Sequence, residues 1–215
     1  MSGYAVKEMF LTLQGEGIQA GMRAVFVRFA GCNLWSGREA DRDHADCTFC
    51  DTDFVGINGD NGGRFPDAVA LADKAQELWE RWIEEDGGEM LVVITGGEPM
   101  LQLDAPLVQE LKSRGFRIAI ETNGTLPVAD GVDWICVSPK AGTEIVQRSG
   151  NELKLVWPQV GIDFKELASW DFTHLLVQPM DGPSMHDARE ACIKFVVRHP
   201  RWRLSLQTHK TIGLR

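Results

Sequence analysis

Residues 90–99 read Met90-Leu91-Val92-Val93-Ile94-Thr95-Gly96-Gly97-Glu98-Pro99, and this stretch decides the fold class. Its apolar part is near-continuous, which is typical of a strand covered on both faces in a parallel sheet. A helix is predicted soon after it over Ala105–Arg114, with Asp104 as the N-cap and Gly115 as the stop signal. A strand that leads through a glycine-rich turn into a helix is one unit of an α/β fold.

The same alternation continues along the chain. Apolar runs rich in branched and aromatic residues predict further strands, and helical spacing predicts further helices. The predicted strands are Arg23–Ala30, Met90–Thr95, Phe116–Glu121, Asp133–Val137, Glu152–Trp157, His174–Gln178 and Trp202–Leu206. The other predicted helices are Pro66–Glu85, Met185–Arg198 (with Ser184 as N-cap) and a shorter Phe164–Trp170, and Gly56–Gly63 is predicted as a surface loop. Strands outnumber full crossover helices, so the sequence predicts an open or partial β/α barrel with some helices shortened to loops.

Polar or glycine-rich motifs follow several of the predicted strands. They are Gly31-Cys32, Thr95-Gly96-Gly97-Glu98-Pro99, Glu121-Thr122-Asn123-Gly124, Ser138-Pro139-Lys140 and Gln178-Pro179-Met180-Asp181. In β/α architectures the carboxyl ends of the strands carry the functional site. Packing alone does not explain so many polar motifs at one edge, so we expect a site there.

Bulk composition excludes several classes of protein. The 215 residues fit a single domain, and 44% hydrophobic with 25% charged residues is ordinary for a soluble globular protein. The net charge of -9 argues against binding to nucleic acid or to a membrane surface. No signal peptide is visible, and the longest aliphatic run, Met90 to Ile94, is far too short for a membrane helix. We therefore expect a cytoplasmic protein.

Three of the five cysteines lie together as Cys32, Cys47 and Cys50, with the spacing Cys-x14-Cys-x2-Cys. Soft thiolates on one tight turn favour zinc or an iron–sulfur cluster. A structural zinc site needs a fourth ligand, for which His44 is the nearby candidate. Free thiols with a thioredoxin-like redox role are a further interpretation. The third is a 4Fe-4S cluster with three thiolate ligands, which leaves one iron open. Cys136 and Cys192 stand alone, and we expect both to be small buried hydrophobic residues.

The cysteines together with Gly96-Gly97-Glu98-Pro99 resemble the radical S-adenosylmethionine (SAM) superfamily, although the usual spacing there is Cys-x3-Cys-x2-Cys. Within it, nearly the whole chain resembles the 7-carboxy-7-deazaguanine synthases of the queuosine (7-deazapurine) pathway, some of which carry this longer loop. Besides the motifs at the strand ends, the resemblance includes Leu13-Gln14-Gly15-Glu16-Gly17, Arg28 to Trp35, Phe49-Cys50-Asp51-Thr52, Gly182-Pro183 and Gln207-Thr208-His209-Lys210.

The resemblance implies a fold and a reaction. The fold is a partial (open) β/α barrel of the radical SAM type with about six parallel strands and a reduced set of helices. The enzyme is a Mg-dependent radical SAM carbon–nitrogen lyase that contracts the ring of 6-carboxy-5,6,7,8-tetrahydropterin to 7-carboxy-7-deazaguanine and releases ammonia. Its rivals are another radical SAM enzyme, such as a glycyl-radical activating enzyme, and a zinc-stabilised module without catalysis.

The resemblance also implies residue roles, with no catalytic side chain beyond cofactor and cluster. Cys32, Cys47 and Cys50 ligate the 4Fe-4S cluster, and Thr52 coordinates Mg²⁺. SAM is contacted by Phe49, Cys50, Asp51, Gly97, Ser138, Pro139, Lys140, Gln178, Pro179, Met180 and Asp181. The substrate is contacted by Leu13, Gln14, Gly15, Glu16, Arg28, Thr95, His209 and Arg215. Two of these roles have a physical reason as well. Arg28 can bind a carboxylate through its planar fork, and a side chain at position 97 would intrude on the cofactor.

The organisation and partners follow from the same resemblance. We expect one radical SAM domain over 1–215, with a cluster-binding loop over 31–52 and a C-terminal tail over about 207–215 that caps the substrate. The partners implied are the small pterin substrate, a flavodoxin-like electron donor and a second copy of the chain in a homodimer.

Overall fold

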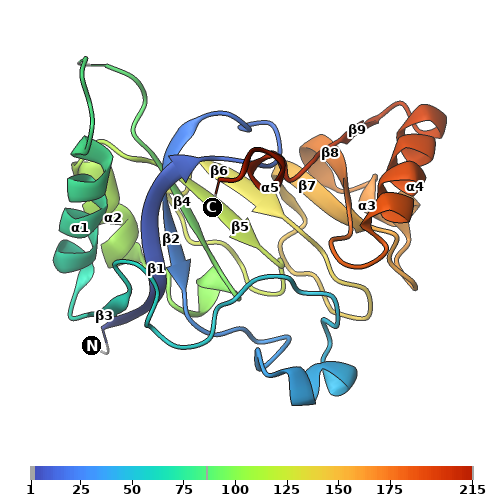
Figure 1. The fold of residues 1–215 in the computed structure, drawn as a ribbon, viewed down its shortest axis with the longest axis horizontal. Coiled ribbons are helices and arrows are strands. Elements are labelled where there is room, and N and C mark those ends of the chain that lie inside the picture. Colours follow the sequence, from blue (N-terminus) through green and yellow to red (C-terminus); the bar gives the residue numbers. More distant parts are fainter. Residues whose placement is uncertain (1–2, 86, 215) are drawn as a thin grey trace.

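A computed structural model describes residues 3–85 and 87–214. Over those residues the chain forms a nine-stranded sheet in the order β3-β1-β2-β4-β5-β6-β7-β8-β9 (Figure 1). The strands are β1 Tyr4–Leu13, β2 Arg23–Phe29, β3 Gly63–Phe65, β4 Leu91–Gly96, β5 Arg117–Thr122, β6 Trp134–Val137, β7 Ser149–Trp157, β8 Asp171–Pro179 and β9 Trp202–Leu204.

The sheet is mostly parallel and unclosed. β2, β4, β5, β6, β7, β8 and β9 pair in parallel, whereas β1 runs antiparallel to both β2 and β3. The outermost strands β3 and β9 stand at opposite ends of the strand order, so the barrel stays open. The prediction of an open β/α barrel is confirmed, with seven parallel strands in the described residues where about six were expected.

Strand β1 was missed because Lys7 and Glu8 interrupt its apolar pattern. Both side chains are nevertheless buried at 8% exposure. Lys7 forms an ion pair with Asp53 at 2.8 Å, and Glu8 accepts a hydrogen bond from Arg28 Nε at 2.9 Å. Lys7 and Glu8 can therefore lie in a buried strand, because each is paired with an opposite charge from a distant part of the chain.

The helices follow local signals closely. They are α1 Ala68–Glu80, α2 Ala105–Ser113, α3 Phe164–Leu167, α4 Met185–Arg198 and α5 Thr208–Ile212, with short 3₁₀ turns at Glu39–His44 and Pro99–Leu101. Asp104 caps α2 as predicted, because its carboxylate accepts from the Leu107 amide at 3.1 Å. α1 ends five residues before the predicted Glu85. Trp82 has a positive φ of 58° and is 87% exposed, so it does not extend the helix.

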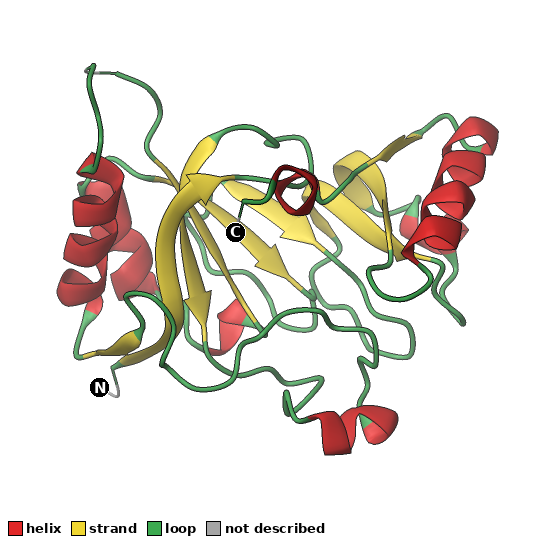
Figure 2. Cartoon of the chain, viewed as in Figure 1, coloured by secondary structure: helices red, strands yellow, loops and turns green. Residues whose placement is uncertain are grey.

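The helices α1 to α4 cover one face of the sheet in two groups, and α5 lies apart from them (Figure 2). α1 and α2 pack on β1, β2, β4 and β5 around a core that includes Leu71, Leu107 and Ile120. α3 and α4 pack on β7 and β8 around Leu155, Val177 and Phe195. The opposite, concave face holds a smaller apolar cluster that includes Ala24, Leu91, Val93 and Ala119. In the described part of the chain, no helix is long and apolar enough to cross a membrane.

Candidate active site

A cavity of about 340 Å³ opens where the parallel strands end. Most of the residues that the sequence singled out line it. They are Leu13, Gln14, Gly15, Glu16, Arg28, Cys32, Cys47, Phe49, Cys50, Asp51, Thr52, Thr95, Gly97, Ser138, Lys140, Gln178, Pro179, Asp181 and His209. The fold therefore gathers segments that are far apart in the chain into one place.

Pro139, Met180 and Arg215 are the exceptions. Pro139 and Met180 do not line the cavity, although their neighbours do. The Pro139 carbonyl accepts from Gln159 Nε2 at 3.4 Å, and the Met180 amide donates to the Trp157 carbonyl at 2.9 Å. These bonds fix the backbone of the segments that reach the cavity. Arg215 lies outside the described residues.

The cysteines Cys32, Cys47 and Cys50 share one wall of the cavity. Burial raises the pKa of the Cys32 and Cys47 thiols. Lys140 opposes this rise at Cys47, whereas the nearby Cys50 adds to it at both positions. The thiols are thus close enough to influence one another's ionisation. Three soft ligands that line one cavity beside a lysine fit an iron–sulfur cluster, which binds thiolates.

The zinc interpretation loses its fourth ligand. His44 is exposed and does not line the cavity. Across residues 3–85 and 87–214, no three His, Cys, Asp or Glu side chains converge as they would around a single ion. A four-iron cluster is larger than one ion, so thiols spread along a cavity wall suit it better.

The Gly-Gly-Glu-Pro motif packs directly against the first cysteine. A Cβ added at Gly97 would lie 2.3 Å from the Gly31 carbonyl oxygen and 2.5 Å from Cys32 Cβ. The Glu98 amide donates to the same Gly31 carbonyl at 3.0 Å. Only glycine allows this approach, so the end of β4 and the cysteine loop after β2 are held as one unit.

Glu98 itself is fully buried and does not reach the cavity. Its carboxylate accepts from Thr122 Oγ1 at 2.7 Å and from the Asn123 amide at 2.8 Å. The Asn123 side chain in turn donates to Asn33 Oδ1 at 2.9 Å, next to Cys32. Burial raises the pKa of Glu98, and these donors oppose the rise. The side chain therefore ties the ends of β4 and β5 to the cysteine loop.

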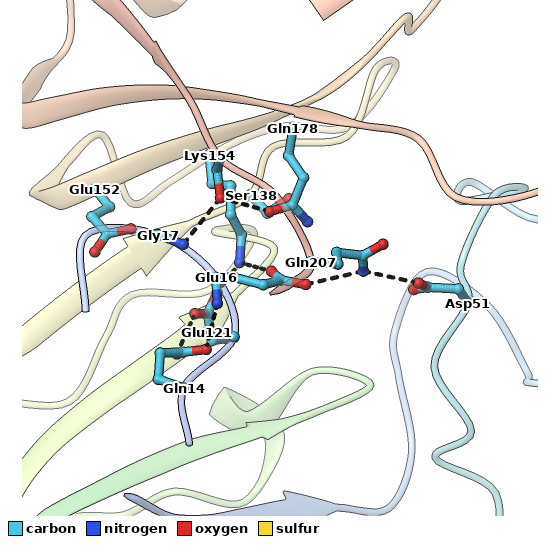
Figure 3. Close-up of polar contacts among 12 residues, drawn as sticks. Gln14, Glu16, Gly17, Asp51, Glu121, Ser138, Glu152, Lys154, Gln178 and Gln207 are labelled. Atoms are coloured by element: carbon cyan, nitrogen blue, oxygen red, sulfur yellow. Dashed lines mark hydrogen bonds and ion pairs between the residues drawn. The ribbon is translucent and has the colours of Figure 1, made fainter. Parts of the chain in front are cut away.

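A buried charge network surrounds Lys154 at the edge of the cavity (Figure 3). Lys154 Nζ lies 2.5 Å from a Glu16 oxygen and 2.7 Å from a Glu121 oxygen. Burial alone would raise the pKa of Glu16, but Lys154 and hydrogen bonds from Gln207 and Gln178 lower it to about 2. Glu16 is therefore an ionised acceptor at neutral pH.

Lys154 was not identified from the sequence. It stands between Leu153 and Leu155 in a strand predicted as apolar, and a charge in such a place is the signal that could have found it. Glu121, in the polar motif at the end of β5, accepts from Lys154 Nζ at 2.7 Å and from Gln14 Nε2 at 3.4 Å.

The last described helix, α5, packs against the loop that holds Gly15 and Glu16 (Figure 1). The Thr208 amide donates to the Gly15 carbonyl at 2.9 Å, and Gln207 Nε2 bonds both Glu16 at 3.0 Å and Asp51 at 3.2 Å. Lys210 joins Asp51 to Asp181, at 2.6 Å from each. Residues 207–210 therefore link the loop that holds Gly15 and Glu16, the cysteine loop and the segment that follows β8.

Ser138, Lys140 and Phe49 line the cavity near the thiols. Lys140 Nζ donates to the carbonyl and the hydroxyl of Ser138, both at 2.8 Å. Its ammonium lies 5.6 Å from the centre of the Phe49 ring. Burial lowers the pKa of Lys140, and the nearby cysteines oppose that change. This part of the cavity offers an aromatic face and a cation close to the thiols.

A comparison with protein families matches residues 44–156 to the radical SAM superfamily. The open barrel, the three thiols and this match define the chain as a radical SAM protein. The chain is 58% identical to the 7-carboxy-7-deazaguanine synthase of Burkholderia multivorans, over 98% of this chain and 99% of that protein. It is 55% identical to the synthase of Bradyrhizobium diazoefficiens, over 99% of each chain. The chain belongs to the 7-carboxy-7-deazaguanine synthase family.

A solved structure agrees with this assignment. The crystal structure of QueE from Escherichia coli superposes with a TM-score of 0.71 at 29% identity, over 96% of this chain and 95% of that one. The family predicted from the sequence motifs is thus confirmed, and so is the fold.

Proposed function

We propose that this chain is a 7-carboxy-7-deazaguanine synthase, a carbon–nitrogen lyase that converts 6-carboxy-5,6,7,8-tetrahydropterin to 7-carboxy-7-deazaguanine and ammonia. The observation that carries the proposal is that one cavity holds the three thiols on one wall and the Glu16–Lys154 pair at its edge. Family membership supplies the substrate and the reaction type.

The cysteine side of the cavity is assigned to the cluster and the cofactor. Cys32, Cys47 and Cys50 would hold the 4Fe-4S cluster, which together with SAM supplies a 5'-deoxyadenosyl radical when bound. The chain's own contribution is position. Gly97 lines the cavity and would offer its backbone to the cofactor, and Phe49 offers a ring for stacking. SAM would be bordered by Phe49, Cys50, Asp51, Gly97, Ser138, Pro139, Lys140, Gln178, Pro179, Met180 and Asp181.

The other side is assigned to the substrate. Gln14 and the ionised Glu16 offer acceptors for the N–H groups of an amino-pyrimidinone edge, with backbone groups of Leu13 and Gly15 beside them. Arg28 and Thr95 pair in register on the inner face and would bind the substrate carboxylate. His209, and Arg215 beyond the described residues, would cap the pocket. Holding the pterin rigidly matters because a primary carbon radical abstracts whichever hydrogen lies nearest.

Thr52 would coordinate Mg²⁺ together with oxygens of the substrate. Mg²⁺ prefers hard oxygen ligands and keeps few protein contacts, and Thr52 lines the same cavity as Arg28. Chelating divalent ions should then abolish turnover, and added Mg²⁺ should restore it. Activity that is indifferent to chelation would remove this assignment.

Four further features are proposed on the family resemblance alone. The chain would form one domain, with the cluster loop over 31–52 and the capping tail over about 207–215. It would act as a homodimer in the cytoplasm and receive electrons from a flavodoxin-like protein. We propose no nucleic-acid or membrane partner, in keeping with the net charge of -9.

The deciding experiment is an anaerobic assay with a reduced cluster, SAM, Mg²⁺ and 6-carboxy-5,6,7,8-tetrahydropterin, followed by mass spectrometry. We expect 7-carboxy-7-deazaguanine to form. Formation of 5'-deoxyadenosine without that product would keep the radical chemistry but point to another substrate, such as the protein substrate of an activating enzyme. Protein without iron or sulfide after reconstitution would overturn the proposal.

A further inference from the structure

The long gap between Cys32 and Cys47 folds back to its starting point. The Cys47 amide donates to the Leu34 carbonyl at 3.3 Å, so residues 35–46 leave the cysteine loop and return to the same place. This excursion carries the 3₁₀ turn Glu39–His44, seen in blue at the lower edge of Figure 1. Cys47 is thereby brought back beside the start of the loop, as a much shorter gap would bring it.

The excursion has its own internal packing. Trp35 is 8% exposed, its ring meets Phe54 edge-on at 5.6 Å, and its indole N–H donates to the Arg38 carbonyl at 3.2 Å. Ser36 Oγ donates to Asp41 at 2.5 Å. A segment with a buried aromatic side chain and internal hydrogen bonds is an ordered element. Its position therefore constrains the cysteine loop to which it is connected.

Arg42 connects this element to the last two cysteines. Its Nη1 donates to the Thr48 carbonyl at 2.9 Å and to the Cys50 carbonyl at 3.2 Å. Its guanidinium lies 4.0 Å from the centre of the Trp35 ring, and its Nε is 2.8 Å from Glu39. The side chain is only 23% exposed. Arg42, which belongs to residues 35–46, thus holds the backbone of the Cys47–Cys50 turn by hydrogen bonds.

We propose that Arg42 is a positioning residue for the cluster. It fixes the Cys47–Cys50 turn through its contacts to the Thr48 and Cys50 carbonyls and places a positive charge on that turn. One guanidinium nitrogen, Nη1, donates to both carbonyls while the guanidinium plane lies over Trp35 and Nε pairs with Glu39, and the compact ammonium of a lysine cannot keep all of these contacts at once. The cation favours the more negative, reduced state of the cluster. The inference rests on the proposed function in one respect, which is that these cysteines hold a cluster.

The test compares three variants of the full-length protein. Arg42→Gln removes the charge, Arg42→Lys keeps the charge but not the planar guanidinium, and Asp43→Asn is the matched control because it removes one charge from an exposed side chain of the same 3₁₀ turn. The readouts are the rate of iron loss to a chelator, the midpoint potential of the cluster, and amide exchange of residues 47–50 in protein stripped of iron.

We expect Arg42→Gln to lose iron about tenfold faster, in line with the loss of two charge-assisted hydrogen bonds, and to shift the midpoint potential to a lower value. Amide exchange of residues 47–50 should rise in the iron-free protein. Arg42→Lys should recover the potential but not the iron retention. Asp43→Asn should retain iron like the unaltered protein.

Wild-type iron retention and potential in folded Arg42→Gln would overturn the inference. If that variant failed to fold by circular dichroism, equal iron retention in Arg42→Lys and the unaltered protein would overturn it instead. An unaltered protein that binds no iron would be a failure of the proposed function, and amide exchange in the iron-free protein would still report on the grip of Arg42.

Discussion

The ammonium of Lys154 lies 2.5 Å from the carboxylate of Glu16, although 138 residues separate them in the chain. Glu121 accepts from the same ammonium at 2.7 Å, and the lysine side chain is only 6% exposed. Burial opposes the charge on Lys154, but the two carboxylates raise its pKa well above the usual range. The network therefore fixes the loop that holds Glu16 to β7. It requires one ammonium and two carboxylates to give up most of their contact with water, which opposes folding.

Removing the lysine should destabilise the fold strongly. Lys154→Met keeps the length of the side chain but leaves Glu16 and Glu121 facing each other without a cation. Loss of one partner of a buried ion pair costs about 3–5 kcal/mol, so the free energy of unfolding in urea should fall by about that amount. Lys74→Met is the control, because its pair with Glu77 is on the surface and should contribute at most about 0.5 kcal/mol. A Lys154→Met protein as stable as this control would contradict the prediction.

Glu16 should make the stability depend on pH. Its pKa is about 2 in the folded chain against an ordinary value of 4.5, so the folded state favours the ionised form. A lowered pKa contributes stability that is complete above about pH 4.5 and is lost as pH falls towards about 2. Over that window the unaltered protein should lose up to about 1.4 kcal/mol per pH unit from this group.

Glu16→Gln removes that contribution. The difference in free energy of unfolding between the unaltered protein and Glu16→Gln should therefore shrink as pH falls from about 6 to about 2. Urea denaturation at several pH values measures it. A difference that stays constant with pH would mean that Glu16 is not held ionised by Lys154.

Local signals were enough to predict much of the fold. α4 spans Met185–Arg198, as the helical spacing and the following Pro200 predicted, and β4 with its glycine-rich end was recognised from the apolar run. β1 was missed because Lys7 and Glu8 look like surface residues until Asp53 and Arg28 are placed beside them. A sequence displays the charge on a residue but not the distant partner that neutralises it.

The functional site was likewise predicted only in part from the sequence. The cysteines and the motifs at the strand ends were visible because each is local, and the cavity gathers nearly all of them. Lys154 and the grip of Arg42 on the Cys50 carbonyl depend on contacts made only after folding. The contact of Lys154 joins segments that are 138 residues apart. The contact of Arg42 depends on how the segment between Cys32 and Cys47 folds back.

Gly97→Ala should disrupt the cysteine loop. The added Cβ would stand 2.3 Å from the Gly31 carbonyl oxygen, which is backbone and cannot rotate away. The cysteine loop or the end of β4 must then move, so we expect most of the bound iron to be lost. Gly21→Ala is the control, since its Cβ meets nothing within 4 Å and adds only the strain of a positive φ of 92°. Full iron content in Gly97→Ala would show that the close approach is not needed.

Gly15→Ala should instead damage substrate binding and leave the cluster in place. A Cβ at Gly15 would lie 2.1 Å from His209 Nδ1 and 2.7 Å from His209 Cβ, so the whole side chain must shift. The Gly15 carbonyl also accepts from the amide and the hydroxyl of Thr208, at 2.9 and 2.8 Å. The substitution therefore pushes α5 away from Gly15, whereas the cysteine loop keeps its own contacts to the Gly31 carbonyl and to Arg42. We expect normal iron content, continued cleavage of SAM, and a KM for the pterin raised about tenfold or more, which corresponds to about 1.4 kcal/mol of lost binding. His209→Ala in the Gly15→Ala background should relieve the clash and restore part of the affinity. A Gly15→Ala protein that loses iron as Gly97→Ala does would mean that the loop that holds Gly15 and the cysteine loop are not independent.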